Sequence, residues 1–133
     1  MNVKIADLMV KNVTTVGPHD ALSTARDKMH KKRIGALPVV GPDGEALGIV
    51  TATDLVEETQ AERVEDVMTV GVRQVPAYNE VSVAARVMRK HKIHHVVVTH
   101  EKKVVGILSS FDLLKLVEDK RFAMKNPPTP RAR

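Results

Sequence analysis

Apolar residues recur at helical spacing in two separate stretches of the chain. In each stretch three apolar residues occupy positions i, i+3 and i+7. They are Leu22, Ala25 and Met29 in the first stretch, and Val81, Ala84 and Met88 in the second. This spacing puts the three side chains of each set on one face of a helix. Asp20 and Asn79 stand just before the two stretches and are predicted to cap the first turns. The pattern therefore predicts two amphipathic helices.

Shorter apolar runs around each helix predict strands. Strands are expected at 13–16, 36–40 and 47–51 in the first half, and at 72–75, 96–99 and 104–109 in the second. Gly41-Pro42-Asp43-Gly44 between two of these runs is typical of a turn. Helical segments are also expected at 5–9 and 64–68, and from Leu55 and Leu113 onward. The predicted order is β-α-β-β-α, twice.

The two halves are copies of one unit. A shift of 59 positions aligns Met29 with Met88, and after the turn a shift of 58 aligns Asp54 with Asp112; fourteen identities fall on this alignment. One unit buries too little surface to be stable alone. We therefore predict an α/β (α+β) fold of two tandem β-α-β-β-α repeats, packed sheet to sheet with pseudo-two-fold symmetry. The expected divisions are repeats at 1–61 and 62–119 and a tail at 120–133, with any ligand at the seam.

Composition excludes several classes of protein. The 133 residues include no cysteine, which rules out disulfides, thiol catalysis and thiolate metal sites. Only 2% are aromatic, so the chain is poorly equipped to stack nucleic-acid bases. No apolar run approaches the roughly 18–20 residues that span a bilayer, and no secretion signal is evident, so a cytoplasmic protein is expected. Motifs for phosphate loops, nucleophile elbows or metalloprotease pairs are also missing, and no enzyme activity is expected.

The net charge of +5 comes from the tail. Residues 1–119 hold equal numbers of basic and acidic residues, and the excess lies on Lys120, Arg121, Lys125, Arg131 and Arg133. Three prolines make this segment a poor helix or strand. It is interpreted as a solubilising terminus, with a specific contact to an anionic partner as the alternative.

One motif carries chemistry and occurs in both repeats. Gly48-Ile49-Val50-Thr51 is followed by Asp54, and Gly106-Ile107-Leu108-Ser109 by Asp112. A hydroxyl and free N–H groups at a helix start can hold a phosphate, and a carboxylate there can accept both hydrogen bonds of a ribose diol. The alternative is that these residues only cap their helices. The presence of two copies favours the binding interpretation.

These motifs together resemble the CBS (cystathionine β-synthase) family. The Asp-x-Met segments, the stretch 34–40 and the two Gly–hydroxyl–Asp motifs follow one another in the family's order over about residues 4–119. The resemblance implies a regulatory pair of repeats with two clefts that binds AMP, ADP, ATP or S-adenosylmethionine. It also implies a homodimer, and Mg²⁺ where the ligand is ATP.

The resemblance also implies a set of residues for each cleft. The first cleft would use Thr14, Ile34, Thr51 and Asp54 of the first repeat with His94, His95 and Ile107 of the second. Thr51 and Asp54 would bind phosphate and ribose. The two histidines stand where the γ subunit of AMP-activated protein kinase, a member of the family, has phosphate-binding basic residues.

The second cleft would mirror the first. Its residues would be Arg73, Ile93, Ser109 and Asp112, with Gly35, Ala36 and Ile49 across the seam. This repeat departs from the family pattern at Val97, where the first repeat has Pro38, and it has Phe111 beside the expected ribose. No metal site is expected, although His91 and His94 at i, i+3 leave that alternative open.

Two functions are compatible with these features of the sequence. The first is an adenine-nucleotide sensor that regulates a partner protein. The second is an adaptor whose basic tail contacts nucleic acid or an acidic protein, with the repeats as scaffold. Loss of the tail would separate them, because only the adaptor would lose its partner.

Overall fold

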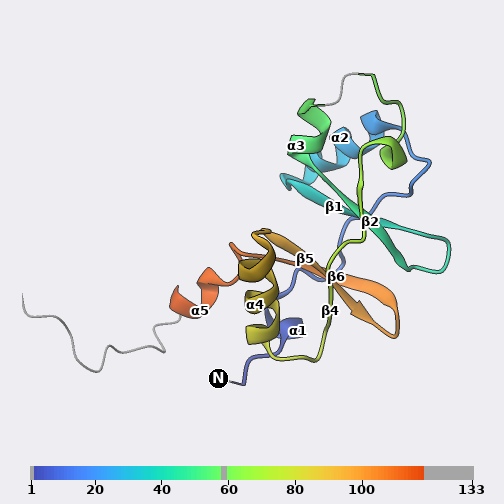
Figure 1. Ribbon diagram of the computed structural model, residues 1–133. Coiled ribbons are helices and arrows are strands. Elements are labelled where there is room, and N and C mark those ends of the chain that lie inside the picture. Colours follow the sequence, from blue (N-terminus) through green and yellow to red (C-terminus); the bar gives the residue numbers. More distant parts are fainter. Residues whose placement is uncertain (1, 58–59, 119–133) are drawn as a thin grey trace, which may run out of the picture.

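The computed structural model describes residues 2–57 and 60–118, and it contains two three-stranded sheets with helices around them (Figure 1). In chain order the elements are α1 (Ile5–Leu8), α2 (Leu22–Lys32), β1 (Ala36–Val40), β2 (Ala46–Thr51), α3 (Ala52–Glu57), η1 (Val64–Asp66), β3 (Thr69–Val70), β4 (Gln74–Pro76), α4 (Val81–His91), β5 (His95–His100), β6 (Lys103–Ser109) and α5 (Leu114–Glu118). The sheets run β1-β2-β3 and β4-β5-β6. The predicted mixed α and β fold is confirmed. The tail at 120–133 lies outside the described residues.

Each sheet buries one face against its helices. The apolar stripes predicted for α2 and α4 are both buried. In the first half they pack on Leu37, Val39 and Val50, and in the second on Val96, Val98 and Leu108. Burial of such a side chain contributes about 1.5–3 kcal/mol. These two clusters are the cores of the molecule.

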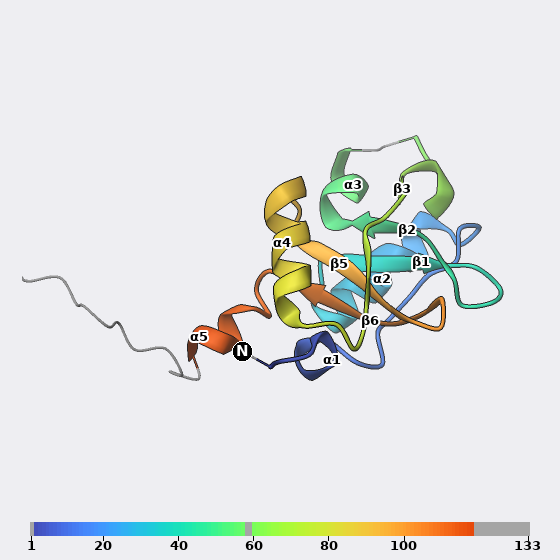
Figure 2. The ribbon, with the colours of Figure 1, turned by 60° about the horizontal axis from the view of Figure 1, so that its bottom comes forward.

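The opposite faces of the sheets meet at a seam. Pro38 and Val97 alternate with the core residues of β1 and β5, are fully buried, and belong to neither helix-side cluster. Strands β1 and β6 are in contact, and Figure 2 shows the strands of both sheets together in the middle of the molecule. Residues at the strand ends therefore reach the seam from both repeats.

The short helices are exchanged between the halves. Although α1 begins the chain, it lies beside α4 of the second half (Figure 1), and Ile5 is buried in the second core. Conversely, Val64 of η1 is buried in the first core, and its N–H donates to the carbonyl of Asp20 at 2.9 Å. Each core is thus completed by a segment from the other repeat.

The strand predicted at 13–16 is wrong, whereas its counterpart in the second half forms as β4. In the second half the N–H of Val97 donates to the carbonyl of Arg73 at 3.1 Å. Pro38 occupies the equivalent place in β1 and has no N–H to donate. Pairing is therefore reduced to one bridge between Val16 and Val39.

The predicted caps of the long helices are also wrong. The N-cap residues are Ala21 and Glu80, and neither makes a side-chain capping bond. The first N–H of each helix instead donates to a backbone carbonyl of the other repeat, from Leu22 to Glu62 at 3.0 Å and from Val81 to Val3 at 2.9 Å. Backbone hydrogen bonds from the other repeat therefore satisfy the first N–H groups, which a capping side chain was expected to do. Among the helices of the described residues, none is long and apolar enough to cross a membrane.

Candidate functional site

The first hydroxyl–Asp motif forms a closed box at the start of α3. The Thr51 N–H donates to Asp54 Oδ2 at 2.8 Å, and the Asp54 N–H donates to Thr51 Oγ1 at 3.3 Å. This is the reciprocal geometry of a capping box. It uses Oδ2 and leaves Oδ1 of Asp54 with its acceptor capacity, since a carboxylate accepts about four hydrogen bonds.

The second motif repeats this box. The Ser109 N–H donates to Asp112 Oδ2 at 2.8 Å, and the Asp112 N–H donates to Ser109 Oγ at 3.1 Å. Here the box closes a turn rather than a helix, because α5 begins only at Leu114. Asp112 is largely buried, and its Oδ1 lies 3.7 Å from the ammonium of Lys115. The capping role and an available carboxylate oxygen therefore coexist in both copies.

Two hollows open at the seam, one beside each box. The Thr51 cleft has a volume of about 580 Å³ and is lined by Gly35, Ile49, Thr51, Ala52, Thr53, Thr69, Gly71, Val72, Arg73, His91, Ile93, His94 and His95. The Ser109 cleft has about 550 Å³ and is lined by Val10, Asn12, Val13, Thr14, Lys32, Arg33, Ile34, Gly35, Ala36, His95, Ile107, Ser109, Phe111 and Asp112. Both volumes fall in the range of small-molecule sites. Both clefts draw on the two repeats.

The predicted residues reach the clefts in a different grouping. Thr14, Ile34 and Ile107, expected beside Thr51, lie in the Ser109 cleft. Arg73, Ile93 and Ile49, expected beside Ser109, lie in the Thr51 cleft. Gly35 and His95 line both, Ala36 lines only the Ser109 cleft, and His94 only the Thr51 cleft. Asp54, expected in the Thr51 cleft, is not among its lining residues. The expected division of Thr14, Ile34 and Ile107 from Arg73, Ile93 and Ile49 was therefore wrong.

Two segments, each of which crosses the last strand of one repeat's hairpin, explain this exchange. Val10 and Ile107 donate to each other's carbonyls at 2.9 and 3.3 Å, which carries the stretch to Thr14 along β6. In the same way β3 pairs with β2 at Gly48 and Ile49 and carries the chain to Arg73. Each hydroxyl–Asp box therefore faces the segment that precedes the long helix of the other repeat.

The two motif glycines permit this close crossing. A Cβ on Gly48 would lie 2.6 Å from the carbonyl oxygen of Thr69, and one on Gly106 would lie 2.9 Å from that of Val10. Real Cβ atoms do not approach backbone oxygens so closely. The glycines of the motif are thus required by the fold, before any ligand is considered.

The two histidines differ in the clefts that they line, since His94 lines the Thr51 cleft and His95 lines both. His94 Nδ1 lies 3.3 Å from Ser110 Oγ, a contact within the second repeat. Burial lowers the pKa of His95, the charge of His94 lowers it further, and Asp112 acts in the opposite direction. His95 is therefore mainly neutral at pH 7. Within residues 2–57 and 60–118, no three His, Asp or Glu side chains are grouped to hold a metal ion.

Three basic cleft residues were not predicted. Lys32 and Arg33 line the Ser109 cleft and His91 the Thr51 cleft, and all three come from the ends of α2 and α4. Arg33 caps α2 in the left-handed conformation, with φ 53° and ψ 48°. No motif marks these positions. The alignment of the repeats, which places Lys32 opposite His91, was the one available signal.

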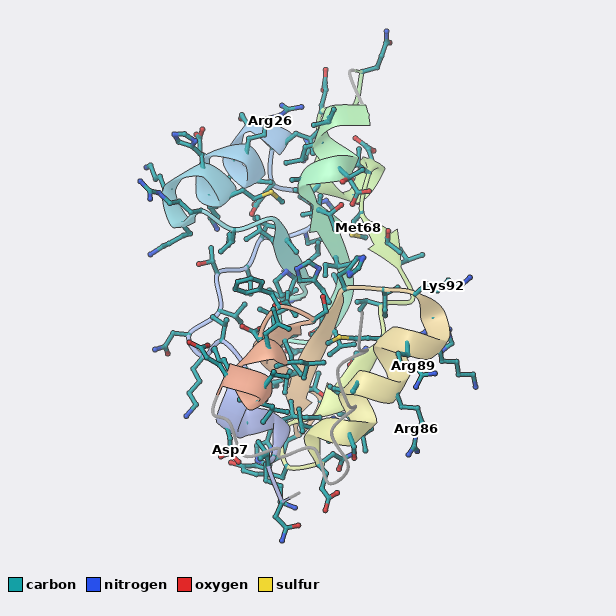
Figure 3. The ribbon with its side chains drawn as sticks, turned by 90° about the vertical axis from the view of Figure 1, so that its left-hand side faces the viewer. Asp7, Arg26, Met68, Arg86, Arg89 and Lys92 are labelled. Carbon is teal, nitrogen blue, oxygen red and sulfur yellow. The ribbon has the colours of Figure 1, made fainter. Side chains whose placement is uncertain are left out.

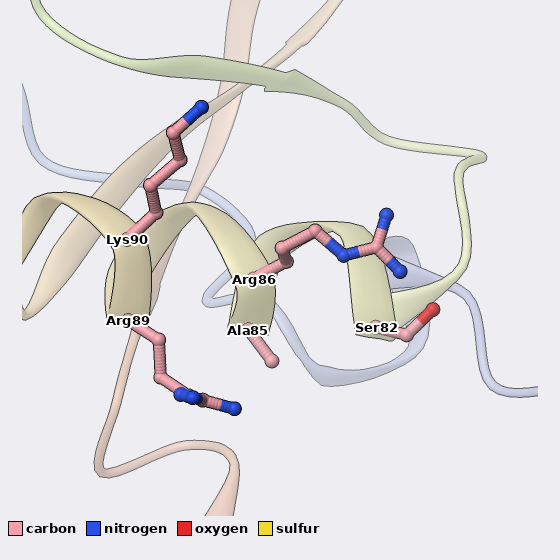
Figure 4. A pocket seen from close by; sticks show the side chains of 5 residues that line it. All are labelled: Ser82, Ala85, Arg86, Arg89 and Lys90. Carbon is pink, nitrogen blue, oxygen red and sulfur yellow. The ribbon is translucent and has the colours of Figure 1, made fainter.

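A third hollow lies on the outer face of α4. It is lined by Ser82, Ala85, Arg86, Arg89 and Lys90, and Lys90 and Arg89 extend to opposite sides of the helix (Figure 4). Arg86 and Arg89 point away from the body of the molecule (Figure 3). Because these charges diverge, this surface does not form a convergent anion site.

Comparison with known proteins agrees with the geometry. The family model described as CBS domain matches residues 5–60 and again 64–119. Hypoxic response protein 1 of Mycobacterium tuberculosis is 31% identical over 116 residues, covering 82% of this chain and 81% of that protein. Hypoxic Response Protein I, solved with two coordinated zinc ions, is similar with a TM-score of 0.76 at 27% identity over 85% of this chain and 98% of that one.

A further solved relative binds adenosine derivatives. The CBS domain pair of protein MJ0100, in complex with 5′-methylthioadenosine and S-adenosyl-L-methionine, matches with a TM-score of 0.84 at 27% identity. The match covers 91% of this chain and all of that one. The double family match, the repeated hydroxyl–Asp box and the paired clefts agree. The chain therefore belongs to the CBS domain family and carries two CBS domains in tandem.

Proposed function

We propose that this CBS domain pair is a regulatory module that binds an adenosine-containing ligand at the seam and acts on a partner protein. Its ligand is AMP, ADP, ATP or S-adenosylmethionine. CBS domain pairs are typically regulatory, and the similar pair of protein MJ0100 was solved with two adenosine derivatives. The observation that carries the proposal is that each cleft is lined by the hydroxyl residue of a hydroxyl–Asp box. Asp112 itself lines the Ser109 cleft, and Asp54 is held beside the Thr51 cleft by its bonds to Thr51.

The proposed binding mode follows from the chemistry of the clefts. A ribose diol would donate to Asp54 in the Thr51 cleft and to Asp112 in the Ser109 cleft. The apolar walls would take the base, at Ile49 and Ile93 in the first cleft and at Ile34 and Ile107 in the second. Rigid boxes keep the carboxylates in place, which limits the ordering cost of binding.

Thermal denaturation with a panel of ligands tests this function. AMP, ADP, ATP, NAD, GMP and S-adenosylmethionine would each be added to the full chain. A ligand at about 100 times its dissociation constant stabilises the folded state by about 2.7 kcal/mol, which raises the melting temperature by several degrees. This rise is expected for at least one adenosine-containing ligand. No rise with any of them would contradict it.

A further inference from the structure

The Ser109 cleft has an excess of fixed positive charge. Its one carboxylate, Asp112, already has the ammonium of Lys115 at 3.7 Å. Lys32 and Arg33 line the same cleft, are exposed, and take part in no ion pair found among residues 2–57 and 60–118. Both side chains are charged at any pH near neutrality. Two positive charges at this cleft are therefore free for an anion.

The position of these two residues favours their charge. Both stand at the end of α2, where the helix dipole stabilises cations. The backbone of Arg33 is held by donation of its N–H to the carbonyls of Met29 and His30. The backbone positions of Lys32 and Arg33 beside the cleft are therefore fixed, while their charged groups can move to reach a ligand.

The Thr51 cleft differs in charge. Its one permanent cation is Arg73, and no cation is paired with Asp54 in the described part of the chain. Its remaining basic groups are histidines. Burial and the charges of Arg73 and Lys90 lower the pKa of His91, and burial and His94 lower that of His95. Near pH 7 the lining of this cleft therefore has one permanent positive charge, that of Arg73, whereas the lining of the Ser109 cleft has two, those of Lys32 and Arg33.

We propose that Lys32 and Arg33 are phosphate-binding residues and that the Ser109 cleft selects phosphorylated adenosine ligands at neutral pH. This inference rests on the proposed function. Phosphate selectivity is thus assigned to the Ser109 cleft, although His94 does not line it. The reason is that the charges of lysine and arginine, unlike that of histidine, are permanent near neutral pH. Arginine and lysine also form stronger, charge-assisted hydrogen bonds with phosphate oxygens.

Calorimetric titration of the full chain at pH 7.5 with ATP and with adenosine tests the assignment. A charge-assisted hydrogen bond contributes about 1.5–3 kcal/mol, so Lys32→Gln/Arg33→Gln should weaken ATP binding at least about tenfold. Adenosine binding should change little. The matched control is Lys31→Gln/Arg89→Gln, which also removes one lysine and one arginine but from exposed positions outside both clefts. The charge-conserving Lys32→Arg/Arg33→Lys should keep ATP affinity.

Repeating the titrations with Asp54→Ala locates the effect, because only the Ser109 cleft then keeps its carboxylate. The loss of ATP affinity caused by Lys32→Gln/Arg33→Gln must persist when Asp54→Ala is also present. Equal losses in the control, no loss at all, or a loss that vanishes with Asp54→Ala would each overturn the assignment. If adenosine itself does not bind the wild type, the proposed function fails as well; if adenosine binds and ATP binds no tighter, only the assignment fails.

Discussion

At the scale of single residues, Asp54 has two roles that can be measured separately. Its Oδ2 accepts from the Thr51 N–H, and its other oxygen faces no cation among the described residues. Asp54→Ala should therefore lower adenosine affinity of the Thr51 cleft at least about tenfold. Loss of the box should also reduce the free energy of unfolding by about 1 kcal/mol.

Calorimetry and urea unfolding check the two effects. Asp27→Ala serves as the control, because Asp27 is an exposed carboxylate on α2 outside both clefts. If Asp54→Ala binds adenosine in both clefts as tightly as the wild type does, Asp54 is a capping residue and nothing more.

The histidines predict a pH dependence. His95 has a lowered pKa, so its neutral form contributes stability above about pH 6.5, and that contribution is lost as the pH falls. A bound phosphate favours the protonated ring and should offset the loss. AMP affinity relative to adenosine should therefore rise between pH 7.5 and 5.5 more in the wild type than in His95→Asn. This comparison cancels protonation of the AMP phosphate, and equal rises would remove His95 from phosphate binding.

Part of the candidate site could be predicted from the sequence, since the duplicated motif marks Thr51, Asp54, Ser109 and Asp112, and all of these except Asp54 line a cleft. Lys32 and Arg33 could not be predicted, because helix-end lysines and arginines are ordinary solvated residues in any sequence. Their place at a cleft depends on how the two sheets meet, which no local pattern records.

At the scale of elements, the crossing segments govern both stability and the composition of the clefts. Gly48→Ala would drive a Cβ against the carbonyl of Thr69 and should reduce the free energy of unfolding by about 1–3 kcal/mol. Gly35→Ala is the matched control, since nothing lies within 4 Å of a Cβ built there. Urea unfolding would compare them. A Gly48→Ala protein as stable as Gly35→Ala would mean that the β2–β3 crossing is looser than the 2.6 Å approach to Thr69 implies.

Elements with strong periodicity were predicted well and those set by crossings were not. The stripes of α2 and α4 and the runs of β1 and β2 depend on local apolar spacing, and they form close to the expected positions. The expected strand at 13–16 does not form because Pro38, on the neighbouring strand β1, has no N–H to donate to it. Pro38 lies far from this segment along the chain, so the local pattern could not exclude the strand.

At the scale of the whole molecule, a homodimer remains a prediction, and the exposed apolar residues indicate its surface. The apolar stripes of α2 and α4 are buried within the chain. Large exposed apolar residues lie instead on α3 and α5, with Val56 79%, Leu114 55% and Val117 68% exposed. A two-fold dimer that covers them is the commonest arrangement.

Light scattering tests this assembly. The wild type should have about twice the 14.7 kDa mass of the chain at micromolar concentration. Leu114→Asp/Val117→Asp should return the single-chain mass, whereas Arg86→Asp, on the outer face of α4, should not. A wild type that stays at the single-chain mass at high concentration, with and without nucleotide, would rule the dimer out.

The claim that unites both clefts is that carboxylates beside the seam hold a ribose diol. Calorimetric titration of the full chain with adenosine and with 2′,3′-dideoxyadenosine tests it most directly, because the two ligands differ only in the diol. We predict that removal of the diol weakens binding at least about tenfold, since each lost hydrogen bond to a charged group is worth about 1.5–3 kcal/mol. Equal affinity for the two nucleosides would contradict the assignment of Asp54 and Asp112.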